Sequence, residues 1–336
     1  MKLRHFNIPV FIPEEACPNR CVFCNQHRIA GAECAPSVEE VISKIDALLL
    51  TIPEESEVEI AFFGGNFTGI PVKEQKAYLE SVQPYIQSGR VHGIRLSTRP
   101  DYISKTVLDL LKQYHVTAIE LGAQSLDAEV LILAGRGHSA AQVNDAAEMI
   151  KENGFQLGLQ MMIGLPGDTP EKSIFTAQEI IRLGADCTRI YPTLVIKNTD
   201  LEQLLLDGKY QPLSLEEAVS QVADLVPLFV NAGVKILRVG LHPSEGLIDN
   251  TSLVAGPFHV AFGEMVFSEI WRRIVSEMVF ANGKRNILTL TVANGMRNAA
   301  IGHKAMNKAL LLESFRKVVF EESADLKGFE YHAHTV

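Results

Sequence analysis

Three cysteines, Cys17, Cys21 and Cys24, fall within eight residues of this sequence. A structural zinc site normally uses four protein ligands, and a disulfide uses two cysteines. Three thiolates on one short loop therefore indicate a metal centre that keeps one coordination position open. A cubane iron–sulfur cluster bound in this way would have three irons held by the protein and a fourth iron free to take a chelating ligand.

Two other interpretations of the cysteine loop remain open on spacing alone. Zinc could be bound by the three thiolates with Cys34 or His27 as the fourth ligand, although zinc sites more often pair one Cys-x2-Cys with another. The thiols could also form a buried cluster without a metal. Cys187 precedes a buried strand and is predicted to be a core residue.

The composition is that of an ordinary soluble enzyme, with 47% apolar and 21% charged residues in 336. The formal net charge of −9 argues against binding nucleic acid by bulk electrostatics, but a local basic patch remains open. We find neither a signal-peptide pattern nor an apolar run of transmembrane length. Only five cysteines occur, so we expect no disulfide framework and a cytoplasmic location.

Short β-branched runs alternate with longer helical patterns along the first two thirds of the chain. Strands are predicted at residues 7–12, 58–63, 93–98, 117–122, 156–163, 188–193 and 234–239. Helices are predicted at residues 37–50, 105–114, 140–152, 171–183 and 215–229. This alternation predicts an α/β fold with a parallel sheet covered by helices, and six or seven such units favour a barrel or partial barrel.

After Gly240 the alternation stops. Residues 241–259 are rich in turn-forming residues and are predicted to be a long loop, followed by a helix at 261–279 and a strand at 287–292. We therefore predict two domains, residues 1–240 and residues 241–336, the second being a small α+β unit.

The second domain contains a pattern that resembles the core of a KH module. A strand is followed by Ile-Gly-His-Lys-Ala-Met-Asn (301–307) at a helix start and then by another strand. In KH modules a Gly-x-x-Gly loop clamps the nucleic-acid backbone, but here Ala305 replaces the second glycine. Local positive charge comes from Lys304, Lys308, Arg316 and Lys317. Two interpretations of this unit remain open: a degenerate KH-like module and an ordinary β-α-β cap that covers the barrel.

The cysteine loop, with Phe23 before its third cysteine, resembles the signature of the radical SAM superfamily. A second match is the Gly64-Gly65-Asn66 stretch at the end of a predicted strand, where only glycine allows close backbone approach freely. The resemblance implies a partial (β/α)6 barrel of the TIM type. It also implies that Cys17, Cys21 and Cys24 hold a [4Fe–4S] cluster whose open iron binds S-adenosylmethionine, which is cleaved reductively to a 5′-deoxyadenosyl radical.

Longer stretches narrow the resemblance to the radical SAM part of the Elongator catalytic subunit. They are residues 97–103, 119–138, 160–169 and 189–219. Oxygen-independent coproporphyrinogen oxidases are similar more distantly. The resemblance implies an enzyme that modifies a tRNA base and takes electrons from a donor such as flavodoxin or ferredoxin. The alternative is a radical SAM enzyme acting on a small metabolite or cofactor precursor. Elongator proteins also carry an acetyltransferase domain, for which the residues after Gly240 are too few.

The resemblance also assigns roles to residues at the strand ends. The predicted cofactor-binding residues are Phe23, Gly64, Gly65, Asn66, Ser97, Arg99, Gln124, Ser125, Arg136 and Gly164. His138 is predicted to contact the carboxylate of the cofactor or the substrate together with Arg136. Tyr191 and Lys197 are predicted to act at the catalytic site by contacting the substrate. Each of these polar residues, taken singly, could instead cap a loop or form a turn.

Overall fold

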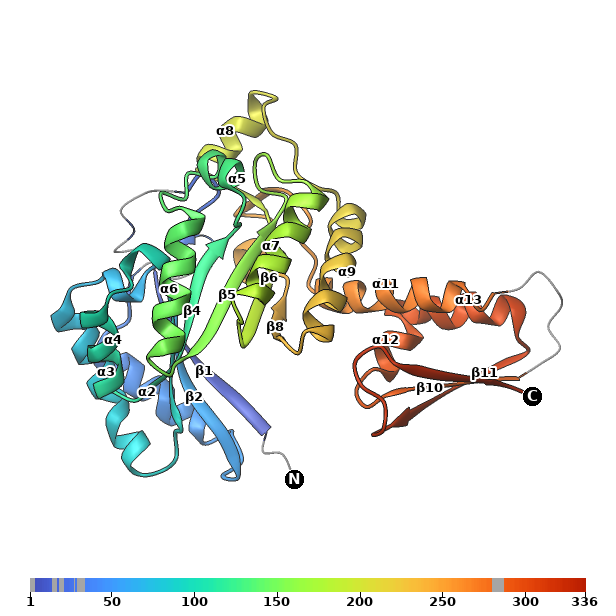
Figure 1. Ribbon diagram of the computed structural model, residues 1–336, viewed down its shortest axis with the longest axis horizontal. Coiled ribbons are helices and arrows are strands. Elements are labelled where there is room, and N and C mark those ends of the chain that lie inside the picture. Colours follow the sequence, from blue (N-terminus) through green and yellow to red (C-terminus); the bar gives the residue numbers. More distant parts are fainter. Residues whose placement is uncertain (1–3, 14–16, 18–20, 27, 29–33, 280–286) are drawn as a thin grey trace.

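The computed structural model describes residues 4–13, 17, 21–26, 28, 34–279 and 287–336. Seven parallel strands form one sheet that curls into a half-barrel with helices on its outer face (Figure 1). In sheet order the strands are β1 (Arg4–Ile12), β2 (Ser56–Gly64), β3 (Gly93–Thr98), β4 (Val116–Gln124), β5 (Gln156–Ile163), β6 (Cys187–Pro192) and β8 (Lys235–Val239). The predicted partial barrel is confirmed, and each predicted strand end lies within three residues of the observed one.

The helices follow the strands in the expected alternation. They are α2 (Val38–Leu49), α3 (Val72–Gln87), α4 (Lys105–Gln113), α6 (Ala140–Glu152), α7 (Pro170–Arg182) and α9 (Leu215–Asn231). Ser37, Ser139 and Ser214 begin α2, α6 and α9 with complete capping boxes. A capping box satisfies backbone donors at the helix start that have no partner within the helix, so these three boundaries are specified by the local sequence.

The two faces of the curled sheet differ in chemical character. The outer face presents valine, isoleucine and leucine to the helices and forms the main core, to which Ile60, Leu96 and Ile119 belong. The concave face carries charged residues instead. This division follows from the period-2 alternation of side chains along a strand. Glu59, Arg95, Glu120 and Arg189 come from four strands of this sheet, and ion pairs link them across this face.

Glu59 and Arg95 show how charges are accommodated on the concave face. Glu59 accepts hydrogen bonds from Arg95 (3.1 Å) and Thr117 (2.6 Å) and lies 2.8 Å from His5 Nε2. Burial raises the pKa of Glu59, but these partners outweigh it and hold that pKa at about 2. The stabilisation from this carboxylate is therefore fully present above its ordinary pKa of 4.5 and is lost as the pH falls towards 2.

Short elements connect the strands at the mouth of the half-barrel. They are η1 (Phe67–Gly69), η2 (Pro100–Tyr102), α5 (Ala128–Leu133), β7 (Val195–Ile196), α8 (Asp200–Leu206), α10 (Glu245–Ile248) and β9 (Leu253–Ala255). The prediction of a loop over residues 241–259 was wrong in part, because α10 and β9 lie within it. β9 pairs antiparallel with β7, matching Val195 with Ala255. So short a strand forms only because it pairs with β7, which is distant in the sequence. It therefore shows no strand pattern in its own residues.

The C-terminal unit is a small sheet packed on helices, beside the half-barrel (Figure 1). Its elements are α11 (Phe262–Ser276), β10 (Ile287–Ala293), α12 (Arg297–Ile301), η3 (His303–Ala305), α13 (Met306–Ser314), β11 (Lys317–Ser323) and β12 (Tyr331–Thr335). β10 pairs parallel with β11 and antiparallel with β12. Helix α11 belongs to both cores: Val266 packs in the core of the half-barrel, and Trp271 packs fully buried in the core of the C-terminal unit.

None of the helices that the structure describes is both long enough and apolar enough to cross a bilayer.

Candidate functional site

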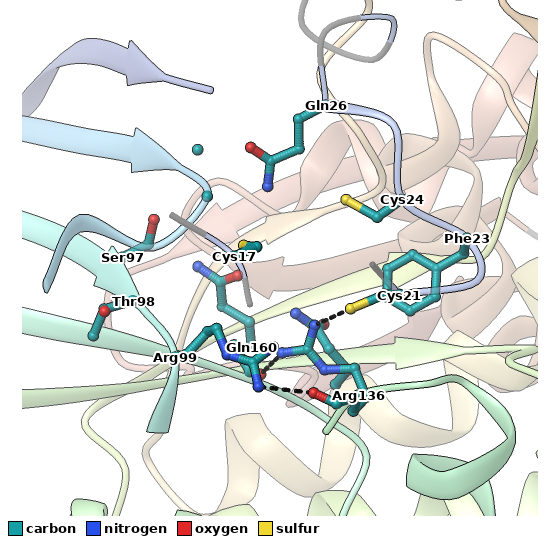
Figure 2. Close-up of a pocket in the computed structure, with 14 residues that line it drawn as sticks. Cys17, Cys21, Phe23, Cys24, Gln26, Ser97, Thr98, Arg99, Arg136 and Gln160 are labelled. Carbon is teal, nitrogen blue, oxygen red and sulfur yellow. Dashed lines mark hydrogen bonds between the residues drawn. The ribbon is translucent and has the colours of Figure 1, made fainter. Parts of the chain in front are cut away.

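A cavity opens at the C-terminal ends of the first five strands (Figure 2). Its empty space, counted with the open mouth, is about 560 Å³. Its lining residues are Cys17, Cys21, Phe23, Cys24, Gln26, Gly64, Gly65, Ser97, Thr98, Arg99, Gly122, Gln124, Arg136 and Gln160. The structure thus brings together the three cysteines and seven of the ten predicted cofactor-binding residues.

The described residues 21–26 of the cysteine loop are held from two sides. The N–H of Val22 donates to the carbonyl of Ala134 at the end of α5 (3.1 Å), and the N–H of Leu201 in α8 donates to the carbonyl of Val22 (2.7 Å). The ring of Phe23 packs against a small buried cluster that includes Val130 and Leu165. This part of the loop therefore depends on elements that follow β4 and β6, which lie far away in the sequence.

Two arginines provide positive charge near the cysteines. Arg136 Nη1 donates to Cys21 Sγ at 3.1 Å, as Figure 2 shows, and Arg99 Nη2 donates to the carbonyl of Arg136 at 2.9 Å. Arg99 is also paired through two bonds of 2.9 Å with Asp101. A guanidinium beside the sulfur compensates the negative charge of a metal-bound thiolate, so this corner of the cavity suits an anionic centre.

His138 is buried near these arginines. Burial, together with the positive charges of Arg136 and Arg99, lowers the pKa of its ring to about 3. The imidazole is therefore uncharged at neutral pH, and it adds no repulsion to the two guanidinium groups.

Two glycine positions allow the backbone to come close to neighbouring groups. Gly64 has φ +125°, and a side chain there would collide with the carbonyl oxygen of Ile12. The N–H of Gly65 donates to that same oxygen (3.0 Å), so the glycine pair ties the end of β2 to the end of β1. At Gly122 an added Cβ would lie 3.0 Å from Gln124 Nε2 and 3.4 Å from Arg136 Nη2. A larger residue there would crowd the cavity wall.

Three predicted cofactor-binding residues do not line the cavity. Asn66 lies behind it, where Oδ1 accepts hydrogen bonds from Thr98 Oγ1 (2.6 Å) and from the N–H of Arg99 (3.2 Å). Ser125 is buried and accepts a bond from the N–H of Asp127 (3.1 Å). Gly164 borders a second hollow, and its carbonyl accepts a bond from the hydroxyl of Tyr210 (2.7 Å). Their direct contact with a cofactor stays a prediction.

The predicted catalytic residues Tyr191 and Lys197 lie outside the lining as well. Tyr191 follows Arg189 on the concave face of β6 and is near its guanidinium. Lys197 adjoins the cysteine loop through its backbone, because its carbonyl accepts a bond from Asn25 Nδ2 (3.4 Å). Of the alternative zinc ligands, Cys34 is exposed and His27 lies outside the described residues. Cys187 is buried on β6, as predicted for a core residue.

Four lining residues, Gln26, Thr98, Gly122 and Gln160, were not predicted from the sequence. For Gln160 a signal was present, because it is the polar exception in the apolar middle of QLGLQMMI. Thr98 is the last residue of β3, next to the predicted Ser97 and Arg99.

The cavity wall fits a polar ligand. Buried donors and acceptors that have no hydrogen-bond partner in the structure as described are Gln26 Oε1, Arg99 Nη1, Gln124 Oε1 and Arg136 Nε. Buried polar groups of this kind are normally satisfied, so they match a ligand rich in amino, carboxylate and hydroxyl groups. In the described part of the chain no three His, Cys, Asp or Glu side chains are placed to share one metal ion.

This chain is similar in sequence to known proteins over much of its length. The tRNA uridine(34) acetyltransferase of Dehalococcoides mccartyi is 26% identical over 257 residues, which cover 66% of this chain and 56% of that protein. Elongator complex protein 3 of Schizosaccharomyces pombe is 28% identical over 194 residues, covering 51% of this chain and 36% of that protein. The chain thus spans only about half or a third of the length of these relatives.

A solved structure and two family models complete the comparison. Methanocaldococcus infernus Elp3 has the same fold, with a TM-score of 0.63 at 20% identity, covering 82% of this chain and 64% of that one. The Radical_SAM C-terminal domain model matches residues 185–272. The radical SAM superfamily model matches residues 11–179, which is half of the chain. This protein therefore belongs to the radical SAM superfamily.

Proposed function

We propose that this enzyme cleaves S-adenosylmethionine reductively at a [4Fe–4S] cluster and uses the product to modify a base in tRNA. The proposed cleavage of S-adenosylmethionine rests on one observation: the three cysteines, the glycine pair and two arginines line the same cavity. Cys17, Cys21 and Cys24 would hold the cluster. When bound and reduced, the cluster supplies the electron that splits the sulfonium and generates a 5′-deoxyadenosyl radical.

The remaining lining residues would bind and orient S-adenosylmethionine. Gly64 and Gly65 would let its amino-acid end approach the backbone, and Arg136 would pair with its carboxylate. Ser97 and Gln124, which line the cavity at the ends of β3 and β4, would bond the ribose hydroxyls. A flavodoxin or ferredoxin would deliver the electron.

The tRNA half of the proposal rests on two supports. The relatives named above include a tRNA uridine(34) acetyltransferase, and the C-terminal unit would provide a surface for a nucleic-acid backbone. In that unit β10, α12, α13 and β11 follow in the order of a KH core, and residues 302–305 form the connection between the two helices. The cationic residues Lys304, Lys308, Arg316 and Lys317 are all exposed.

The connection between α12 and α13 is anchored towards the half-barrel. The N–H of His303 donates to Ser268 Oγ in α11 (2.7 Å), and its Nδ1 lies 3.1 Å from Glu264 Oε1. His303 is therefore part of the support, whereas Lys304 projects into solvent. Since the first half of α11 packs in the core of the half-barrel through Phe262 and Val266, RNA held at Lys304 would lie on the side of the C-terminal unit that adjoins the half-barrel.

Changing Lys304 and Lys308 together to glutamate should weaken binding of bulk tRNA. If these lysines neutralise phosphates, each neutralised phosphate releases counterions, and the slope of log affinity against log salt should fall by about one for each lysine–phosphate pair removed. Filter binding at several salt concentrations measures both quantities. His303 is left unchanged, because a carboxylate there would face Glu264.

The matched control changes Lys73 and Lys76 to glutamate, two exposed lysines on α3. This control makes the same change in net charge on another helix and should leave tRNA affinity nearly unchanged. No tRNA binding by the native protein at low salt, or equal loss in both double variants, would contradict an RNA role for the C-terminal unit. It would favour a small metabolite or cofactor precursor as the substrate.

A further inference from the structure

A row of polar residues crosses the concave face from the cavity to the open edge of the sheet. Gln160 in β5 is paired in register with Arg189 in β6, and Arg189 is paired with Arg238 in β8. Gln160 lines the cavity. Because neighbouring strands are about 4.8 Å apart, the backbone of Arg238 lies about 10 Å from that of Gln160.

The carboxylates of the concave face are already engaged by other partners. Glu120 accepts bonds from Arg189 (2.6 and 3.1 Å) and from Gln160 (3.0 Å), and it also pairs with Arg95 (3.4 Å). Glu59 is held by Arg95 and its other partners. Arg189 is thus neutralised by Glu120, and its guanidinium also lies over the ring of Phe63, 4.6 Å from the centroid.

Arg238 is the exception in this network. Its Nε is buried without a hydrogen-bond partner, and no acidic side chain among the described residues forms an ion pair with it. A half-buried guanidinium without a counter-ion is electrostatically unfavourable. An anion bound there would supply the missing partner.

Tyr191 adds a hydrogen-bond donor to this position. It follows Arg189 on the same face of β6 and lies near both arginines. Burial raises the pKa of the Tyr191 phenol, so its hydroxyl keeps its proton at neutral pH. Planar guanidinium groups bind phosphate through paired hydrogen bonds, and a neighbouring hydroxyl can complete the coordination of its oxygens.

We propose that Arg238, with Arg189 and Tyr191, binds the phosphate group of the substrate nucleotide. The separation between Arg238 and Gln160 is comparable to the reach from a phosphate across the ribose to its base, so the base would lie at the cavity. This inference rests on the proposed nucleotide substrate and specifies where the nucleotide is anchored.

Isothermal titration calorimetry on the anaerobically reconstituted full chain tests the proposal. The probes are uridine 5′-monophosphate, uridine and acetate. We expect the monophosphate to bind more tightly than uridine. Arg238→Gln should weaken binding of the monophosphate at least tenfold and leave the affinity for uridine unchanged. Arg238→Lys keeps the charge but loses the planar guanidinium group. Its affinity for the monophosphate should lie between those of the native protein and Arg238→Gln.

The matched control is Arg182→Gln, which removes a positive charge from an exposed pair with Glu179 on α7. It should not alter binding of any probe. Equal affinity of native protein and Arg238→Gln for the monophosphate would overturn the phosphate site. A monophosphate that binds no better than uridine, or acetate that binds as tightly as the monophosphate, would also overturn it. Iron content and circular dichroism identify a variant that has failed to fold, in which case Arg238→Lys decides.

The outcomes separate this inference from the proposed function. Bulk tRNA binding through the C-terminal unit does not depend on Arg238. Retained tRNA binding with no effect of Arg238→Gln on the monophosphate would remove the phosphate site and leave the proposed function standing.

Discussion

Replacing Cys21 by alanine should abolish the iron–sulfur cluster. A cubane attached through two thiolates instead of three loses a direct ligand, and Cys21 is also the sulfur that Arg136 contacts at 3.1 Å. Anaerobic reconstitution of the native protein should yield about four irons and four sulfides per chain, with the visible absorbance of such a cluster. The alanine variant should retain almost none of this absorbance, and the same holds for Cys17 and Cys24.

The control for this experiment is Cys187→Ala. Cys187 is buried on the concave face, where its sulfur lies 3.6 Å from Arg95 Nη1. Its removal should leave iron and sulfide content unchanged. A full cluster in the Cys21 variant, or one tightly bound zinc per chain in the native protein, would contradict the assignment of the three cysteines.

Glu120→Gln should lower the free energy of unfolding by about 3–5 kcal/mol, the usual cost of removing one partner from a buried ion pair. Glu120 is 1% exposed and accepts hydrogen bonds from side chains on β3, β5 and β6. The neutral amide would leave Arg189 and Arg95 buried with too little negative charge. Urea unfolding followed by circular dichroism measures the change.

Glu179→Gln is the matched comparison, because it removes the same charge from an exposed pair with Arg182 on α7. Pairs of this kind contribute at most about 1 kcal/mol, so the effect should be small. Similar losses in the two variants would show that the charged network of the concave face is not a major source of stability.

The strands of the half-barrel and five of its six main helices could be predicted because their patterns are local, whereas α3 was not predicted. Gln156–Ile163 reads as a buried strand in isolation, and Ser139 with Gln142 marks the start of α6 without reference to anything else. The cysteines and Gly64 were predictable for a related reason. Metal ligation restricts the one position to cysteine and the backbone conformation restricts the other to glycine. The family resemblance then predicted their roles as cluster ligands and as a cofactor-binding residue.

The features that were missed depend on contacts distant in sequence. β9 exists because β7 pairs with it, and Gln160 lines the cavity because of the curl of the sheet. The same holds for Arg238, whose neighbour Arg189 is set by the register of β6 and β8. In a single sequence Arg238 is one more basic residue in a strand, and only the structure shows that it lacks a carboxylate partner among the described residues.

Helix α11 shows a further limit. A helix that joins two cores and a helix that covers one core can have the same apolar periodicity. Ile270 packs with the half-barrel and its neighbour Trp271 with the C-terminal unit. The predicted boundary near residue 240 could not show that the next helix is shared by both cores.

The most direct test is formation of 5′-deoxyadenosine by the reconstituted, dithionite-reduced protein in the presence of S-adenosylmethionine, measured by chromatography and mass spectrometry. The native protein should release it slowly even without substrate. Gly65→Val should release far less at unchanged iron content, because a side chain on this cavity-lining residue would obstruct the cofactor, and Gly65→Ala should be intermediate. If the native protein carries a full cluster and forms no 5′-deoxyadenosine, or if Gly65→Val forms as much as the native protein, the assignment of this cavity is contradicted.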